Sequence, residues 1–322
     1  MLVGLAVGVP VSAVFLWLAI RGTDLSEVRA ALANARVGPL VLALGAFVLL
    51  YAAQAERWRR IAAVPTLGWT AYAEMVVSAV ACNNVMPARI GDLLRADWLR
   101  RRGGIPAGRA LATVILDRSC DIVVLFVLLV ATLPEVTGSR WSLRIALGTL
   151  TLVAGIALLL VFARAYTTRR PRARLTSRRL VRRIVRDVVE GLAEPMGRRR
   201  LAVALALSVV AWVAFAAAAI CVGRSVGLHL SLVDALFATA VINLGVAIPS
   251  SPGFVGTYQW LGVASLGVAG VDRTSALAFA ILLQAVWYLP TTLVGGGMLA
   301  IRGARTVTAP RRVRRAGSGS AF

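Results

Sequence analysis

Lysine is absent from the sequence, histidine occurs once and cysteine occurs three times. The one histidine, His229, cannot by itself support a metal or catalytic site. Cys82, Cys120 and Cys221 lie in or near apolar segments and lack the spacing of metal ligands. We therefore expect structural thiols rather than a zinc site or a disulfide framework, and no cofactor is expected from the residue pattern.

Acidic residues are also few: 14 stand against 36 arginines, which gives a formal net charge of +22. A charge of this size is typical of nucleic-acid binding, but here the arginines lie in loops beside apolar runs, without interleaved aromatic residues for base stacking. Anionic lipid headgroups at the cytoplasmic surface are therefore the expected partners, and no nucleic-acid partner is expected.

Long apolar runs dominate the sequence, and 59% of all its residues are hydrophobic. Six runs are each long enough to cross a bilayer as a helix. They comprise residues 2–20, 38–55, 111–133, 142–163, 201–222 and 276–300. The first run lacks a charged leader and a cleavage site, so it is interpreted as a retained span. The sequence predicts an all-α polytopic membrane protein, with a membrane domain over 1–302 and a disordered basic cytoplasmic tail over 303–322.

Two further apolar segments, 71–99 and 233–268, are each interrupted near the middle by proline and glycine. The positive-inside rule places most arginines on the cytoplasmic side of a membrane protein. The sequence fits this rule if both termini are cytoplasmic and both segments return to the side they entered. The segments would then be re-entrant hairpins, the first entering from the cytoplasm and the second from outside. Two kinked helices are the alternative.

Opposed hairpins are typical of inverted repeats, and the sequence carries two matches in the same order. Pro87-Ala-Arg-Ile-Gly91 and Pro252-Gly-Phe-Val-Gly256 share a P-x-x-x-G pattern, and residues 110–116 agree with 276–282 at five of seven positions. We expect one repeat at about 38–133 and a second at about 201–300. The predicted helix breaks are Pro87, Gly91, Pro249, Pro252, Gly253 and Gly256.

The first break is rich in polar residues, which are costly beside an apolar run. Its amides and charged groups are Asn83, Asn84, Arg89, Asp92 and Arg95. Arginine presents a fork of donors that suits phosphate, and Asp92 can hold one guanidinium in place. The alternative is a structural pair between Asp92 and one arginine, with snorkelling to the interface.

Further candidates lie in the run 111–133 and in the second break. Asp117 and Asp121 share one helical face, with Arg118 next to it, which predicts either a functional polar site or a structural ion pair. Ser250 and Ser251 can cap the half-helix that follows the second break, where an anion would be attracted. A plain extracellular turn is the alternative.

The basic linker 164–200 carries apolar residues spaced as on one stripe of a helix. This pattern favours an amphipathic helix on the anionic cytoplasmic leaflet. A solvated connector is the alternative.

Four stretches, at 56–61 (ERWRRI), 83–99, 112–123 and 243–259, resemble the lysylphosphatidylglycerol synthase/flippase transmembrane-domain family. The resemblance covers roughly residues 40–300. It implies translocation of a phospholipid, and it makes a homodimer plausible. In full-length family members a separate soluble domain performs aminoacyl transfer; this chain has only a short tail after residue 302, so we expect no synthase activity.

The chain departs from the family pattern at four positions. Asp92 and Asp117 stand where glutamate is usual, Gln259 stands where glutamate is frequent, and Phe254 replaces a glycine.

These observations lead to a hypothesis about function and two alternatives. The expected function is transbilayer movement of an anionic phospholipid or of a polyprenyl-phosphate-linked lipid in the bacterial cytoplasmic membrane. Arg89, Arg95 and Arg118 would meet the phosphate. The alternatives are an intramembrane lipid-phosphate transferase using Asp117 and Asp121, and a noncatalytic membrane partner of a cell-envelope enzyme.

Overall fold

The computed structural model describes residues 2–86, 89–137, 187–188, 191–192, 197–246 and 251–308. Several predicted features lie outside the described residues: the run 142–163, most of the linker 164–200, the end of the tail, and Pro87, Pro249 and Ser250. Within the described part the chain is helical and contains no strand.

The helices follow one another through short connections. The first half comprises α1 (Leu2–Ile20), α2 (Leu25–Ala33), α3 (Val37–Ala62), α4 (Trp69–Val85), α5 (Ile90–Gly103) and α6 (Ala107–Thr137). The second half comprises α9 (Arg198–Ser225), α10 (Leu232–Gly245), the short 3-10 helix η2 (Pro252–Phe254), α11 (Thr257–Val268) and α12 (Arg273–Thr308). Five of the six predicted apolar runs coincide with α1, α3, α6, α9 and α12.

Local sequence signals set several helix ends. Asp24 precedes α2, and its carboxylate accepts hydrogen bonds from the backbone N–H groups of Ser26 (2.8 Å) and Glu27 (3.3 Å). Ser231 and Asp234 form a reciprocal capping box at the start of α10. Such side chains satisfy backbone donors that have no partner inside the helix.

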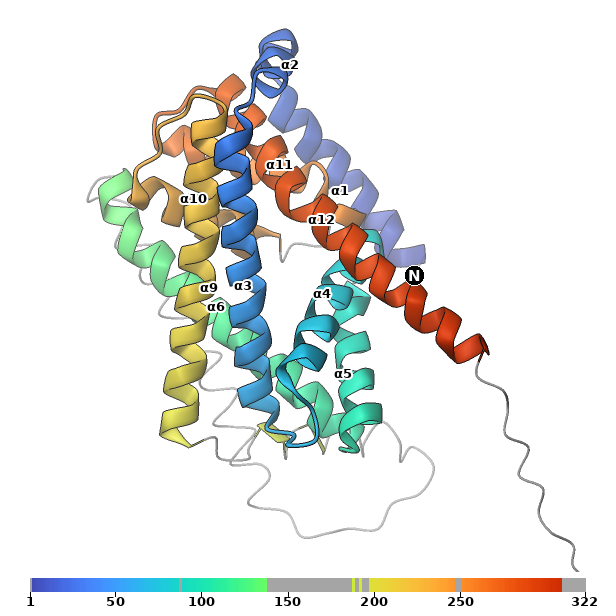
Figure 1. Ribbon diagram of the computed structural model, residues 1–322. Helices are drawn as coiled ribbons and strands as arrows, with labels where there is room; N and C mark the ends of the chain where they lie inside the picture. Colours follow the sequence, from blue (N-terminus) through green and yellow to red (C-terminus); the bar gives the residue numbers. More distant parts are fainter. Residues whose placement is uncertain are drawn as a thin grey trace, which may run out of the picture.

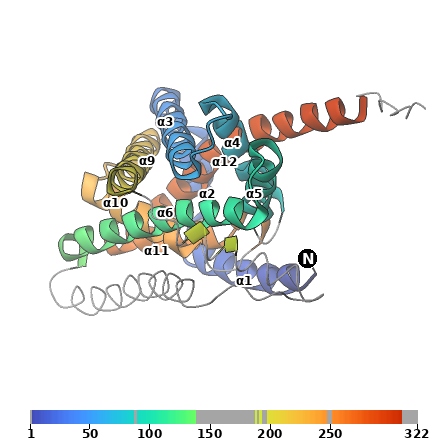
Figure 2. The ribbon, with the colours of Figure 1, turned by 90° about the horizontal axis from the view of Figure 1, so that it is seen from below.

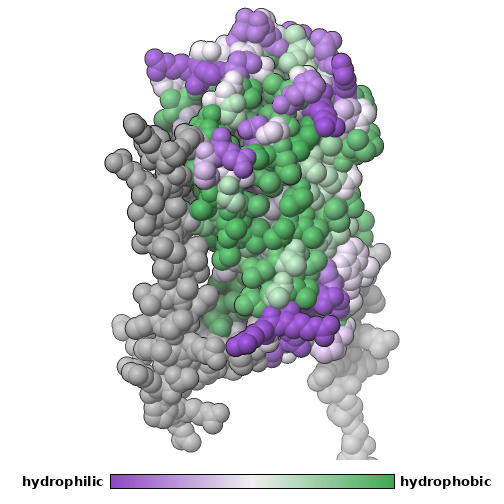
Figure 3. All heavy atoms as spheres, turned by 90° about the vertical axis from the view of Figure 1, so that its left-hand side faces the viewer, coloured by the Kyte–Doolittle hydropathy of each residue, from purple (hydrophilic) through white to green (hydrophobic). Residues whose placement is uncertain are grey.

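The helices Val37–Ala62, Arg198–Ser225 and Arg273–Arg302 are long and apolar enough to cross a membrane, by length and composition. A fourth span is possible if the bent pair Val9–Ile20 and Leu25–Ala33, which meet at 87°, counts as one. The face seen in Figure 3 carries a broad hydrophobic band between two hydrophilic ends. The prediction of an all-α polytopic membrane protein is confirmed.

The two halves of the chain have the same order of elements: a long helix, a short hairpin and a second long helix. Helices α3 and α9 pack against each other along their length, and each hairpin packs on the last helix of the other half, α4 on α12 and α10 on α6. In Figure 1 the α4–α5 hairpin lies in the lower part of the bundle and the α10–α11 hairpin in the upper part. Figure 2 shows α12 running outward past α4 and α5.

Glycine is required where each hairpin turns. A Cβ on Gly91 would overlap the carbonyl oxygen of Ala79, so this glycine permits the close approach of α5 to α4. Gly256 has φ of +87°, and a Cβ there would overlap the backbone of Ser12 in α1. Both positions need a residue without a side chain, for reasons of space at Gly91 and of space and conformation at Gly256.

Candidate functional site

The two helix breaks are in contact with each other. Arg89, which has a left-handed backbone conformation (φ +51°) just before α5, donates from Nη2 to the carbonyl oxygen of Val246 at the end of α10 (2.9 Å). Asn84 Nδ2 donates to the hydroxyl oxygens of Thr291 (3.2 Å) and Thr292 (2.8 Å) in α12. The first break is therefore tied to the second break and to the second half of the chain.

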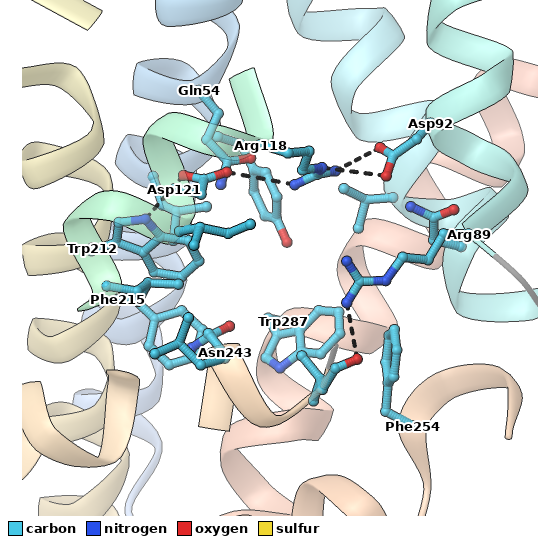
Figure 4. Close-up of a pocket in the computed structure, with 18 of the residues that line it drawn as sticks. Gln54, Arg89, Asp92, Arg118, Asp121, Trp212, Phe215, Asn243, Phe254 and Trp287 are labelled. Atoms are coloured by element: carbon cyan, nitrogen blue, oxygen red, sulfur yellow. Dashed lines mark hydrogen bonds and ion pairs between the residues drawn. The ribbon is translucent and has the colours of Figure 1, made fainter. Parts of the chain in front are cut away.

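A cavity of about 220 Å³ lies where the breaks meet (Figure 4). Both breaks line it, together with α3, α4, α5, α6, α9, α10, α11 and α12. Its polar side chains are Gln54, Asn83, Asn84, Arg89, Asp92, Arg118, Asp121 and Asn243. Its aromatic side chains are Tyr51, Trp212, Phe215, Phe254, Tyr258 and Trp287.

An ion pair connects the first hairpin to α6 at the cavity wall. Arg118 Nη2 lies 2.7 Å from Asp92 Oδ1, and its Nε donates to Asp92 Oδ2 at 3.3 Å. Arg118 also lies near Asp121, with 3.6 Å between Nη1 and Oδ2. Asp92 thus holds Arg118. Its Oδ1 lies farther from Arg95, at 3.9 Å from Nη1.

A second layer of charges lies behind the cavity wall and is closed to the outside. Arg57 of α3 is 0% exposed and Asp117 is 1% exposed. Arg57 donates from Nε to Asp117 Oδ1 (2.7 Å), from Nη2 to Asp121 Oδ2 (2.9 Å) and from Nη1 to the hydroxyl oxygen of Ser208 (2.7 Å). Nη1 also contacts Asp121 Oδ1. Buried charges need such complete pairing, since an unpaired one is very costly.

Arg95 completes this layer, and Trp212 connects the layer to the cavity wall. Arg95 Nη2 donates to Asp117 Oδ2 (2.8 Å), and its guanidinium lies 4.1 Å from the ring centre of Trp58. Trp212 of α9 donates from its indole N–H to Asp121 Oδ1 (3.0 Å). The network therefore fastens α3, α5, α6 and α9 to one another.

The second break is held by neutral groups instead. Gln259 Oε1 accepts from the backbone N–H of Gly256 (2.7 Å), and Gln284 Nε2 donates to the carbonyl oxygen of Gly253 (2.6 Å). Gln259 and Gln284 are also hydrogen-bonded to each other. The first hairpin is thus fixed by a charged pair and the second by a pair of amides.

The structure brings together most of the predicted site residues, but not all of them face the cavity. Asn83, Asn84, Arg89, Asp92, Arg118 and Asp121 line it. Arg95 and Asp117 lie behind its wall. Ser251 is outside the lining: its N–H donates to the hydroxyl oxygen of Ser12 (2.7 Å), and its own hydroxyl donates to the carbonyl oxygen of Val255 (3.3 Å).

Sequence reasoning missed Arg57 as a site residue, because the predicted apolar run ends at residue 55. In the structure α3 continues to Ala62, so Arg57 is inside the bundle. The buried residues Leu50, Gln54, Arg57 and Ile61 recur every three or four positions, which is a helical signal that could have found it. No comparable signal marks the aromatic wall, because Trp212 and Trp287 lie within apolar runs where aromatic residues are ordinary.

These features define a class: a helical membrane protein with a charged cavity enclosed between two broken helical hairpins. A comparison with protein families gives one match, described as "Lysylphosphatidylglycerol synthase TM region", which covers residues 1–295, and the chain belongs to this family. No curated protein matches the chain. The family indicates a role connected with membrane lipids, and the resemblance noted in the sequence is confirmed.

Proposed function

We propose that the protein moves an anionic lipid, either a phospholipid or a polyprenyl-phosphate-linked lipid, between the two leaflets of the bacterial cytoplasmic membrane. The observation that carries this function is the cavity at the meeting point of the two breaks, with Arg89 and Arg118 on its wall. Ionisable side chains within membrane segments usually face a substrate pathway or a water-filled cavity. Guanidinium groups are well suited to the phosphate of a lipid headgroup.

The cavity residues take separate roles in this function. Arg89 and Arg118 bind the phosphate, and Asp92 orients Arg118 through its ion pair. Asn83, Asn84 and Asn243 offer neutral hydrogen bonds along the path. Arg95, Asp117 and Arg57 support the wall from behind, because Asp117 forms ion pairs with both arginines.

The arrangement of the two halves supports an alternating-access mechanism. The hairpins lie at opposite ends of the bundle in Figure 1 and meet at the cavity. If both termini are cytoplasmic, the first hairpin enters from the cytoplasm and the second from outside, as in inverted repeats. The long α3–α9 contact then serves as the common frame against which the hairpins move.

A transferase that uses Asp117 and Asp121 as a metal-binding pair has less support. Both carboxylates accept hydrogen bonds from Arg57, and Asp117 also accepts from Arg95. A metal ion would have to displace a buried arginine from each of them. Transport requires no such rearrangement.

The test is leaflet-resolved lipid translocation in proteoliposomes made with the full chain. Two variants remove charge from the cavity: Arg89→Gln, and the double variant Asp92→Asn with Arg118→Gln, which leaves no unpaired carboxylate. Each should lower the rate by about tenfold or more, since each removes a charge-assisted contact to phosphate. Arg100→Gln, on the exposed face of α5, is the matched control and should retain the wild-type rate. Equal rates in all four proteins would refute this function.

A further inference from the structure

The charges around the cavity do not balance. Four arginines and three aspartates lie in the cavity wall and the layer behind it: Arg57, Arg89, Arg95, Arg118, Asp92, Asp117 and Asp121. The group therefore carries one net positive charge. In a membrane domain an excess charge is unfavourable unless water or a ligand of opposite sign compensates it.

Every carboxylate in this group is already in use. Both oxygens of Asp92 accept from Arg118. Asp117 gives one oxygen to Arg57 and the other to Arg95. Asp121 accepts from Arg57 through both oxygens and also from Trp212. A ligand with an ammonium group would therefore find no free carboxylate among the described residues of the cavity.

The excess positive charge belongs to Arg89. Among the described residues Arg89 makes no ion pair, and its guanidinium donates to a neutral carbonyl oxygen, that of Val246. Its side chain is exposed and lines the cavity. Arg89 is thus the cationic group that an incoming anion can reach without breaking an existing ion pair.

The other half of the cavity adds no charge. Asn243 is an amide whose Nδ2 donates to the carbonyl oxygen of Thr239 (2.8 Å). The remaining wall there is apolar or aromatic, including Phe254, Tyr258 and Trp287. An ammonium group gains some attraction from aromatic faces, but here it would share the cavity with Arg89 and Arg118.

We propose, on the basis of the transport function given above, that the site selects a phosphodiester headgroup with a single net negative charge and no amine. One such group neutralises the charge of Arg89 and makes the whole cluster neutral. A zwitterionic headgroup leaves the excess of one positive charge, and an aminoacylated headgroup increases it. A lipid diphosphate brings more negative charge than the site can match.

The experiment compares three phospholipids that carry the same fluorescent acyl chain and differ in the headgroup, together with a polyprenyl diphosphate that carries the same fluorophore on its isoprenoid chain. Proteoliposomes with the full chain receive labelled phosphatidylglycerol, phosphatidylethanolamine, lysylphosphatidylglycerol or a labelled polyprenyl diphosphate, and the label in the outer leaflet is followed by chemical quenching. Phosphatidylglycerol should cross at least about tenfold faster than each of the other three, since they leave a charge unmatched.

The outcomes separate this selectivity from the function itself. If no lipid moves faster than in protein-free liposomes, the transport function fails. If lipids move but phosphatidylethanolamine, lysylphosphatidylglycerol or the diphosphate equals or exceeds phosphatidylglycerol, transport stands and the selectivity is refuted.

Arg89→Gln tests the assignment of the charge to one residue. This variant removes the excess charge without leaving a carboxylate unpaired, so it should fold as the wild type does. The ratio between the rates for phosphatidylglycerol and phosphatidylethanolamine should fall toward one. Arg100→Gln should keep the wild-type ratio. An unchanged ratio in a well-folded Arg89→Gln protein would overturn the assignment.

Discussion

The guanidinium of Arg89 and the carbonyl oxygen of Val246 are joined by a hydrogen bond of 2.9 Å across 157 residues of sequence. This bond directly connects the breaks of the two hairpins. In the proposed transport function, a headgroup that takes the Nη2 donor of Arg89 would compete with the carbonyl for it. Binding of an anion and separation of the hairpins would then be linked through one side chain.

Replacing Arg57 with glutamine should strongly destabilise the protein. Asp117 and Asp121 would remain buried without their main partner, and breaking a buried pair in this way costs about 3–5 kcal/mol. The free energy of unfolding in detergent, measured by denaturant titration, gives the loss directly.

Arg60→Gln is the control on the same helix, because Arg60 forms an exposed pair with Glu56. Surface pairs of this kind contribute about 1 kcal/mol or less. Equal stability of the Arg57 and Arg60 variants would contradict the structural role of the buried network.

Gly91→Ala should lower the melting temperature, since the added Cβ has to push α5 away from the Ala79 carbonyl. Overpacking of this type costs about 1–3 kcal/mol. Gly45→Ala is the matched control: nothing lies within 4 Å of its position in α3. It should leave stability unchanged or raise it by about 0.5–1 kcal/mol. Thermal unfolding in one detergent measures the melting temperature of both variants, which should fall for Gly91→Ala and should not fall for Gly45→Ala.

The amide pair of the second hairpin should behave as a coupled unit. Gln259→Leu and Gln284→Leu each leave buried polar groups unpaired, at a cost of about 1–3 kcal/mol. The loss of unfolding free energy in the double variant should be smaller than the sum of the two single losses by about 0.5 kcal/mol or more. The reason is that the hydrogen bond shared by the two glutamines is lost only once. Additive losses in denaturant unfolding would show that the two amides act independently.

The topology predicts which loops are accessible from each side of the membrane. After replacement of Cys82, Cys120 and Cys221 by alanine, Arg101→Cys should react with an impermeant maleimide only from the cytoplasmic side, and His229→Cys only from outside. Both native side chains are exposed. Labelling of right-side-out and inverted vesicles distinguishes the sides, and the reverse pattern would refute the orientation.

Much of the fold could be predicted from apolar run lengths and from proline and glycine. The run 201–222 corresponds to α9, which extends a few residues beyond the run at both ends. The interruptions at 86–89 and 246–256 separate the helices of the two hairpins. These features depend on local chemistry, so a single sequence carries them. Whether the hairpins are re-entrant in a bilayer stays a prediction.

The partners of the charged residues could not be predicted in the same way. The sequence offered Arg89 or Arg95 as the partner of Asp92, whereas the structure pairs Asp92 with Arg118 of α6. Helical periodicity tells which residues share a face, but not which helix lies opposite. Asp121 meets Arg57 from α3 and Trp212 from α9 only because these helices pack on α6.

If the protein transports a lipid as proposed, the unmatched charge of Arg89 also determines how the site responds to the membrane potential. Moving one elementary charge across the full potential changes the energy by about 2.3 kcal/mol per 100 mV. An empty site carries that charge, whereas a site holding a monoanionic headgroup is electrically silent. Voltage would therefore bias the return of the unloaded protein and leave the loaded step almost unaffected.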